Sequence, residues 1–240
     1  MKCLRFTLKG KTAFFKQPEV NTFYYFSYGQ VHKVALLGMF GAILGYNGYS
    51  SVVVPKEDYK DFPEFYTKLK DIQISVIPKG KQGIFSKKIQ VFNNSVGYAS
   101  QESGGNLIVK EEWLENPEWT IYVLLNNEES NKLATYLLGN QCIYYPYLGK
   151  NDHLATICNV HVIDIKEIEA EEREIHSLCP SKKVTFDFDE VGFRYAEYLP
   201  VGLKRSTNHY QLEQFYLTDA KVEETEESIY TDGEHNIIFY

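Results

Sequence analysis

Alternation of apolar and polar positions predicts several β-strands in this chain. In residues 2–9, Leu4, Phe6 and Leu8 face one way and the residues between them face the other, as in a half-buried strand. Residues 72–76 alternate in the same way. Further strand patterns occur at 119–125, 155–165, 184–188, 193–199, 211–218 and 236–240.

Helical spacing is clearest in residues 33–45, which are almost entirely apolar and carry Gly38, Gly41 and Gly45. A glycine inside a helix costs about 1 kcal/mol relative to alanine. We interpret these glycines as a device for close packing on a sheet; the alternative is a ligand that approaches the backbone. Other helices are expected at 128–138, in the acidic run 167–174, and as a short helix within 56–70.

Residues 79–118 interrupt this pattern with glycines, lysines and alternating runs, and we expect them to form a long β-hairpin. Without them, the elements follow the order β-α-β-β-α-β, which is the ferredoxin-like, or RRM-like, order. We therefore predict an α+β fold with a domain at 1–166. Residues 167–240 are predicted to be a β-rich C-terminal extension or small second domain. A fold of this kind does not by itself establish a function.

Charge is distributed unevenly along the 240 residues. The formal net charge of −7 alone argues against nucleic-acid binding. Residues 1–100, however, contain 14 Lys and Arg against 6 Asp and Glu, a net of +8, whereas residues 101–240 contain 11 against 26, a net of −15. Such asymmetry suggests one surface for a polyanion and another for solvent or a basic partner. The alternative is a chance gradient over ordinary solvated faces.

The four cysteines are too widely spaced for a zinc site, and we expect buried free thiols in a reducing compartment. The N-terminal residues lack the apolar segment of a signal peptide. The apolar run 34–44 is too short to span a bilayer, which takes about 20 residues. We therefore expect a cytoplasmic protein that has no membrane association and needs no metal or cofactor.

Residues 11–33 combine lysines with aromatic residues, and Glu19 is the segment's one acidic residue. Lysines pair with phosphates, and aromatic rings stack on unpaired bases. We expect about two thirds of these rings to be buried and a minority to meet a ligand. The predicted helix starts beside His32 and Lys33, where free N–H groups favour an anion.

The predicted hairpin carries Lys79, Lys81, Lys87 and Lys88, and no acidic residue occurs from 75 to 101. A projecting hairpin of this charge suits a nucleic-acid backbone, although a merely solvated hairpin fits the pattern equally well. Catalytic motifs such as GxSxG, HExxH and the P-loop are missing from the sequence. His32 and Tyr46 offer a general base and a partner for metal-independent RNA cleavage, but their spacing does not require it.

Three segments together resemble one family. They are FTLKGKTAFFKQPEVNTFYYFSYG, the following HKVALLGMFGAILGYNGY, and the later YYPYLGKNDHLA. They are similar to the CRISPR-associated RAMP proteins of the Cas-five family, which cap the 5′ handle of guide RNA in type I Cascade, and the N-terminal block looks most like subtype I-B. The resemblance is specific over about the first 50 residues and concerns mainly layout beyond them.

The resemblance implies a ferredoxin-like RAMP domain whose long hairpin acts as a thumb. It implies binding of the crRNA 5′ handle, contact with the backbone and large subunits of the complex, and indirect contact with target DNA in antiviral defence. Most relatives are not catalytic, but subtype I-C uses a tyrosine, a lysine and a histidine to cut RNA. The hairpin here contains no lysine–histidine pair, which counts against nuclease activity.

We therefore expect a non-catalytic RNA-binding subunit of a ribonucleoprotein complex. The alternatives are a metal-independent endoribonuclease that processes CRISPR repeats and a protein-only scaffold. Gly149 and Lys150 are expected to let the backbone and a cation approach the RNA. The complete set of candidate RNA-binding residues is Lys11, Lys16, Tyr28, His32, Lys33, Lys79, Lys81, Lys87, Lys88, Gly149 and Lys150.

Overall fold

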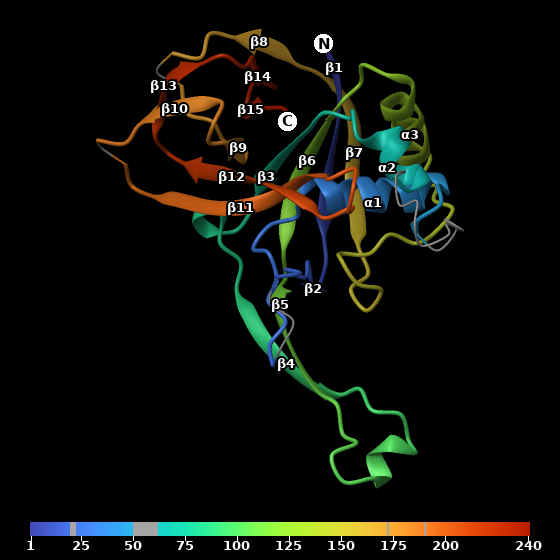
Figure 1. Cartoon of the computed structure of the whole chain (residues 1–240). Coiled ribbons are helices and arrows are strands. Elements are labelled where there is room, and N and C mark those ends of the chain that lie inside the picture. Colours follow the sequence, from blue (N-terminus) through green and yellow to red (C-terminus); the bar gives the residue numbers. More distant parts are fainter. Residues whose placement is uncertain (20–22, 50–61, 172, 190) are drawn as a thin grey trace.

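A four-stranded antiparallel sheet forms the centre of the protein (Figure 1). The computed structural model describes residues 1–19, 23–49, 62–171, 173–189 and 191–240. The strand order is β3-β6-β1-β7. These strands are β1 (Lys2–Lys9), β3 (Ile74–Pro78), β6 (Glu118–Leu124) and β7 (Thr156–Asp164). All four predicted strands of this region are confirmed, with shifts of one or two residues at their ends.

Helices cover one face of this sheet. They are α1 (Lys33–Leu44), α2 (Glu64–Leu69) and α3 (Glu128–Leu138). Leu4, Phe6 and Leu8 of β1 are buried in the cluster that contains the apolar faces of α1 and α3, as the alternation predicts. Asn127 caps α3 by accepting a hydrogen bond from the Ser130 N–H. The sheet and the two longer helices thus follow the order β-α-β-β-α-β. Of the predicted short helix within 56–70, residues 56–61 lie outside the described residues.

The C-terminal third consists of strands. It forms a three-stranded sheet β11-β12-β9, a pair β10-β13 and a three-stranded sheet β15-β14-β8. The strands are β8 (Lys166–Ile168), β9 (Cys179–Pro180), β10 (Val184–Asp187), β11 (Arg194–Leu203), β12 (Tyr210–Thr218), β13 (Lys221–Thr225), β14 (Ile229–Thr231) and β15 (Asn236–Ile238). The prediction of a helix at 167–174 is wrong, because residues 166–168 form a strand that pairs with β14.

This C-terminal part shares its core with the rest of the chain. Leu199 and Phe215 belong to the same buried cluster as α1. Phe239 packs with Cys3 on the helix-free face of the sheet. The Tyr240 backbone exchanges hydrogen bonds with Ile74 at the β3 edge. Strand β11 also crosses α1 on the side away from the central sheet (Figure 1). α1 is therefore covered on two sides, which explains why it is apolar nearly all round.

A long hairpin projects from the body (Figure 1). It consists of the antiparallel strands β4 (Lys87–Asn93) and β5 (Ile108–Glu115), and β2 (Thr12–Ala13) pairs with β5 at its base. Short 3-10 turns lie at Lys81–Gly83 before it and Ala99–Gln101 at its tip. We call residues 87–115 the thumb. The predicted hairpin is confirmed.

Gly41 and Gly45 are required for different reasons. A Cβ at Gly41 would lie 2.5 Å from the Phe65 Cβ in α2. Gly45 ends the helix in the left-handed region, with φ of 78°. Close packing is thus the reason for Gly41, but its partner is α2 and not the sheet. A Cβ at Gly38 would meet its nearest atom, on Phe65, at 4.0 Å.

These distances predict opposite effects for two alanine substitutions in one helix. Gly41→Ala is expected to lower the free energy of unfolding by about 1–3 kcal/mol, because the added methyl group overpacks the contact with Phe65. Gly38→Ala is expected to raise it by about 0.5–1 kcal/mol through helix propensity. Urea denaturation of both variants provides the measurement. Equal effects of the two substitutions would contradict the packing described here.

Cysteine burial differs from the expectation. All four thiols are free, and Cys3 and Cys179 are buried, but Cys142 is exposed and Cys158 is partly exposed. Burial raises the pKa of the Cys3 thiol to about 12. No helix among the described residues is long and apolar enough to cross a membrane.

Candidate nucleic-acid interface

A groove runs along α1, between the loop that precedes β7 and the turn that joins β11 to β12. We call it the α1 groove. Lys204 and His209 of the β11–β12 turn line one end, and Tyr46 and Tyr144 line the other. The residues shared along its length are Lys16, Tyr49, Phe65, Tyr147, Gly149 and Tyr210. The groove is thus bordered by aromatic rings and by cations, with Glu19 as an acidic residue in the part that Lys204 lines.

Several of these rings are open to solvent. Tyr49, Tyr144 and Tyr147 are exposed by 50%, 62% and 45%. The Tyr49 ring contacts Phe65 edge-on, with ring centres 6.5 Å apart, and half of its surface remains open. Exposed flat aromatic faces stack readily on unpaired bases. A groove with stacking faces and basic side chains suits single-stranded nucleic acid.

Tyr147 provides a direct test of stacking in the α1 groove. Tyr147→Ala is expected to weaken binding of single-stranded RNA by about 1–3 kcal/mol, because one stacking face is lost. Tyr147→Phe is expected to keep most of the affinity. Tyr145, which is even more exposed and does not line the groove, supplies the control Tyr145→Ala. Fluorescence anisotropy with a labelled RNA measures all three, and equal losses for Tyr147→Ala and Tyr145→Ala would contradict the assignment.

A second hollow lies at the base of the thumb. Its lining includes Lys16, Tyr25, Phe92, Trp113 and Lys150. The Lys16 Nζ lies 4.0 Å from the centre of the Tyr25 ring, and the Lys150 Nζ lies 5.1 Å from that of Phe92. Lys16 lines both this hollow and the α1 groove, so it marks the point at which the two surfaces meet.

The aromatic loop is more exposed than predicted. We expected about two thirds of its rings to be buried, but fewer are, because the loop lies against the thumb instead of entering the core. Its backbone bonds to β5 through Tyr25, whose N–H donates to the Lys110 carbonyl. The buried rings are Phe14, Phe15 and Tyr28, whereas Phe23, Tyr24 and Phe26 are exposed and Tyr25 is partly exposed.

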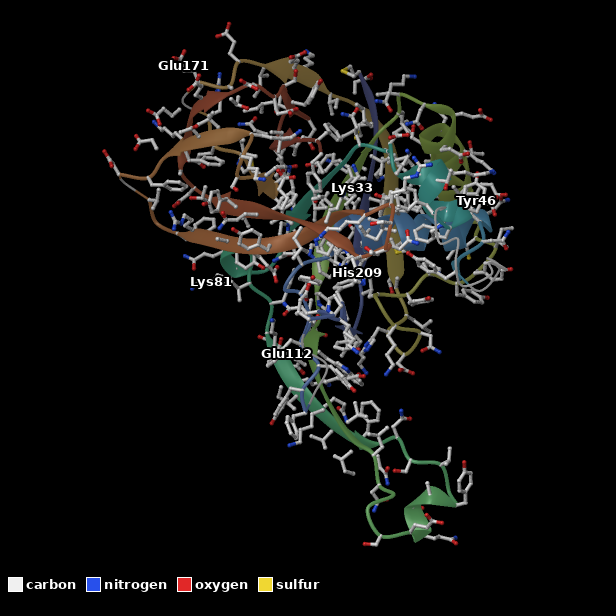
Figure 2. All side chains as sticks on the ribbon, viewed as in Figure 1. Lys33, Tyr46, Lys81, Glu112, Glu171 and His209 are labelled. Carbon is white, nitrogen blue, oxygen red and sulfur yellow. The ribbon has the colours of Figure 1, made fainter. Side chains whose placement is uncertain are left out.

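Carboxylates of β5 pair with Lys87 and Lys88 of the thumb, whereas its third lysine, Lys110, lies over the Tyr24 ring. The Lys87 Nζ lies 2.8 Å from Glu112 Oε1, and the Lys88 Nζ lies 3.8 Å from Glu115 Oε1. Figure 2 shows Glu112 at the base of the thumb. Acidic residues are missing from the first strand of the hairpin but not from the second. Because consecutive residues of a strand face opposite sides, one pair lies on each face of the hairpin. The base of the thumb is therefore ion-paired on both faces and is not the free positive surface that the sequence of β4 suggests.

Lys150 is also paired with carboxylates. Its Nζ lies 3.3 Å from Glu111 Oε1 and 3.1 Å from Asp152 Oδ2. Glu111 is buried and accepts a second hydrogen bond from Trp113 Nε1. The pair thus ties the glycine loop that contains Lys150 to the thumb.

Two predicted RNA-binding residues are buried. Tyr28 and His32 are 3% and 2% exposed. The His32 Nδ1 accepts a hydrogen bond from the Ala35 N–H as the N-cap of α1, and burial lowers its pKa to about 3. A neutral, enclosed histidine does not offer a charge to phosphate. Both residues are therefore enclosed and are poorly placed to contact a ligand in the α1 groove.

Lys33 begins α1 and is half-buried. Burial lowers its pKa to about 8, while nearby Asp71 acts in the opposite direction. Lys33 does not line either of the two hollows. It is thus poorly placed to pair with a phosphate in the α1 groove.

Gly149 does line the α1 groove, but its conformation has an internal cause. Its φ of 87° lies in the left-handed region, and a Cβ there would collide with the Phe14 carbonyl oxygen. The backbone that closely approaches Gly149 is that of Phe14 in this chain. The loop therefore requires glycine at this position in order to fold, whether or not RNA binds over it.

The remaining lysines lie apart from the groove. Lys11 is exposed near the start of β2, and Lys79 lines a small hollow on the helix-free face of the sheet. Figure 2 places Lys81 on the opposite side of the body from Tyr46. The structure thus gathers Lys16, Gly149 and Lys150 into one region. Lys88 lies over the Trp113 ring beside it, whereas Lys87 lies on the other face of the hairpin and lines a separate small hollow with Gly29 and Glu197. Lys79 and Lys81 lie away from this region, and Lys11 lines neither hollow, although its carbonyl accepts a hydrogen bond from Asn116 at the base of the thumb.

Three groove residues were not expected from the sequence: Lys204 and His209 in the β11–β12 turn, and Tyr210 at the start of β12. The residues between the two strand patterns include two basic side chains in succession, Lys204 and Arg205, which is a usable signal. Nothing in the sequence shows that this turn lies beside α1, because the contact joins segments some 170 residues apart. Tyr147 is part of the YYPYLGK segment that supported the resemblance, although it was not singled out.

The Tyr46 hydroxyl takes part in a local hydrogen-bond network. Its hydroxyl donates to Glu129 Oε2 and accepts from Lys132 Nζ, at 2.5 and 2.8 Å. Burial, together with the hydrogen bond to Glu129, raises its pKa. Neither Tyr46 nor His32 is therefore poised to move a proton at neutral pH. No cluster that could hold a metal ion occurs within the described part of the chain.

Several solved structures similar to this chain belong to CRISPR-associated proteins. A chain of a "CRISPR RNA-guided surveillance complex" matches with a TM-score of 0.56 and 13% identity, covering 92% of this chain and 91% of the other. A CRISPR protein from Archaeoglobus fulgidus matches with a TM-score of 0.54 and 8% identity, over 99% and 98%. A chain of the type III-B Cmr-beta complex bound to cognate target RNA matches with 0.51 and 12%, over 92% and 86%.

These likenesses cover nearly the whole of each chain, so the fold is one found among CRISPR-associated proteins. At such low identity they show the fold alone. No protein-family profile matches the sequence, and no curated protein does.

Proposed function

We propose that this chain is a non-catalytic RNA-binding subunit of a type I CRISPR interference complex, of the Cas-five family, that caps the 5′ handle of crRNA. The observation that carries the proposal is the α1 groove, where exposed tyrosines and Lys16 meet the base of a projecting thumb. Single-stranded RNA is the ligand that uses both stacking faces and cations. The subtype within the family is proposed as I-B on the N-terminal motif alone.

The fold supports this assignment. The strand order β3-β6-β1-β7, with two helices on one face, supports a ferredoxin-like domain, and the thumb lies between the second and third strands of that sheet in chain order. The similar solved structures include a chain of an RNA-guided surveillance complex and a chain of a complex bound to target RNA. We extend their setting to this chain, with a backbone subunit and a large subunit as its neighbours.

The geometry favours binding over cleavage. The buried His32 has a pKa of about 3, and the Tyr46 hydroxyl is occupied by Glu129 and Lys132. A ribonuclease site needs a base and an acid that titrate near neutral pH beside an accessible phosphate. We therefore propose that a separate protein cuts the precursor RNA.

Incubation of the purified chain with CRISPR repeat RNA in EDTA distinguishes an RNA-binding subunit from an endoribonuclease. For an RNA-binding subunit we expect a salt-sensitive mobility shift with intact RNA. A single specific cut would instead establish an endoribonuclease. An assembled complex without RNA, seen from its absorbance ratio, would support a protein-only scaffold.

A further inference from the structure

The ion pairs of the thumb follow from the strand register. Lys87 lies opposite Leu114 in the antiparallel ladder, so Glu112, two residues along, shares its face of the hairpin diagonally. The Lys87 Nζ donates to Glu112 Oε1 at 2.8 Å and to the Ser27 carbonyl at 3.3 Å. By the same geometry, Glu115 shares the face of Lys88. The register of the hairpin thus places each glutamate diagonal to its lysine, within reach of an ion pair.

These carboxylates compete with an RNA backbone for the same ammonium groups. The Lys87 and Glu112 side chains are 37% and 18% exposed, and those of Lys88 and Glu115 are 40% and 39% exposed. Each lysine is thus reachable from solvent but already neutralised. A phosphate that replaces Glu112 pairs with the Lys87 ammonium group but leaves the carboxylate unpaired. The net gain in binding free energy is therefore smaller than for a phosphate that binds a free lysine.

We propose that Glu112 and Glu115 set the affinity of the thumb for RNA by occupying Lys87 and Lys88 until phosphates displace them. The inference rests on the proposed function of the chain. Its consequence is selectivity, because an arbitrary polyanion gains little from neutralised lysines. RNA that also stacks in the α1 groove has the additional contacts needed to displace the carboxylates.

Replacing these glutamates by glutamine tests the proposal. Glu112→Gln and Glu115→Gln are each expected to tighten binding of a labelled mixed-sequence single-stranded RNA by about two- to fivefold in the full-length chain. The slope of log affinity against log salt is expected to become steeper by up to about 0.7 per glutamate removed. The gain from Glu112→Gln is expected to vanish in a Lys87→Gln background, because the carboxylate acts through that lysine.

Glu102→Gln removes the same charge from the tip of the thumb, beyond the end of β4, and is the matched control. An equal gain for Glu102→Gln would overturn the inference, since it would reveal only a long-range effect of net charge. An unchanged or weaker affinity of the Glu112→Gln variant for RNA would also overturn the inference. In that case, RNA binding by the wild-type chain would still support the proposed function. If neither the wild type nor any variant binds RNA, the proposed function fails and this inference fails with it.

Discussion

Replacing Lys16 and Lys204 together by glutamine is expected to weaken RNA binding by about 100-fold at physiological salt. Lys16 stands where the α1 groove meets the thumb base, and Lys204 lines the far end of the groove. A lysine that contacts phosphate contributes about 1.4 kcal/mol, or about tenfold, and two that are well separated act additively. Anisotropy titrations with a single-stranded RNA at several salt concentrations provide the measurement.

The salt dependence separates this effect from a loss of folding. The double variant is expected to show a slope shallower by about 1.4, because two fewer phosphates are neutralised. Lys166 and Lys221 lie exposed in β8 and β13, away from the groove, and their double glutamine variant is the control with the same change of charge. An equal loss in this control would place the RNA elsewhere.

Replacing Gly149 by alanine is expected to destabilise the protein by about 3 kcal/mol or more. The residue has a φ of 87°, which costs an alanine about 1–2 kcal/mol, and the added Cβ would meet the backbone carbonyl of Phe14. For a chain of this size the melting temperature is expected to fall by about 10 °C. Thermal unfolding monitored by circular dichroism measures it.

Gly97 in the thumb provides the matched glycine. A Cβ there would have no neighbour within 4 Å, so Gly97→Ala is expected to change the stability by less than about 0.5 kcal/mol. A Gly149→Ala variant that is as stable as Gly97→Ala, yet binds RNA more weakly, would show that Gly149 serves the ligand and not the fold.

Local pattern was enough to predict most elements of the fold. The alternation of Leu4, Phe6 and Leu8 placed β1 correctly, because side chains on one face of a strand must alternate in burial. The acidic run at 167–174 was misread, since its strand depends on pairing with β14 some 60 residues later. The composition of residues 167–174 does not show which distant strand they pair with.

The candidate site was less predictable, for the same physical reason. His32 and Tyr28 were expected to be accessible beside lysines, but burial is decided by what packs around a side chain. Phe15, Tyr28 and Tyr210 all pack around the His32 ring. The lysines of β4 looked unopposed because their carboxylate partners are in β5, on the return strand. Residue type indicates a chemistry, whereas accessibility and pairing arise only when distant segments meet.

Photo-crosslinking of the chain within its purified RNA-containing complex, read out by mass spectrometry, locates the RNA on this protein. We expect crosslinks from the 5′ end of the guide RNA to peptides containing Tyr147 and Tyr25, in the α1 groove and at the base of the thumb. Crosslinks confined to the helix-free face of the sheet, around Arg5 and His161, would contradict this placement of the RNA, as would a complex in which this chain contacts no RNA.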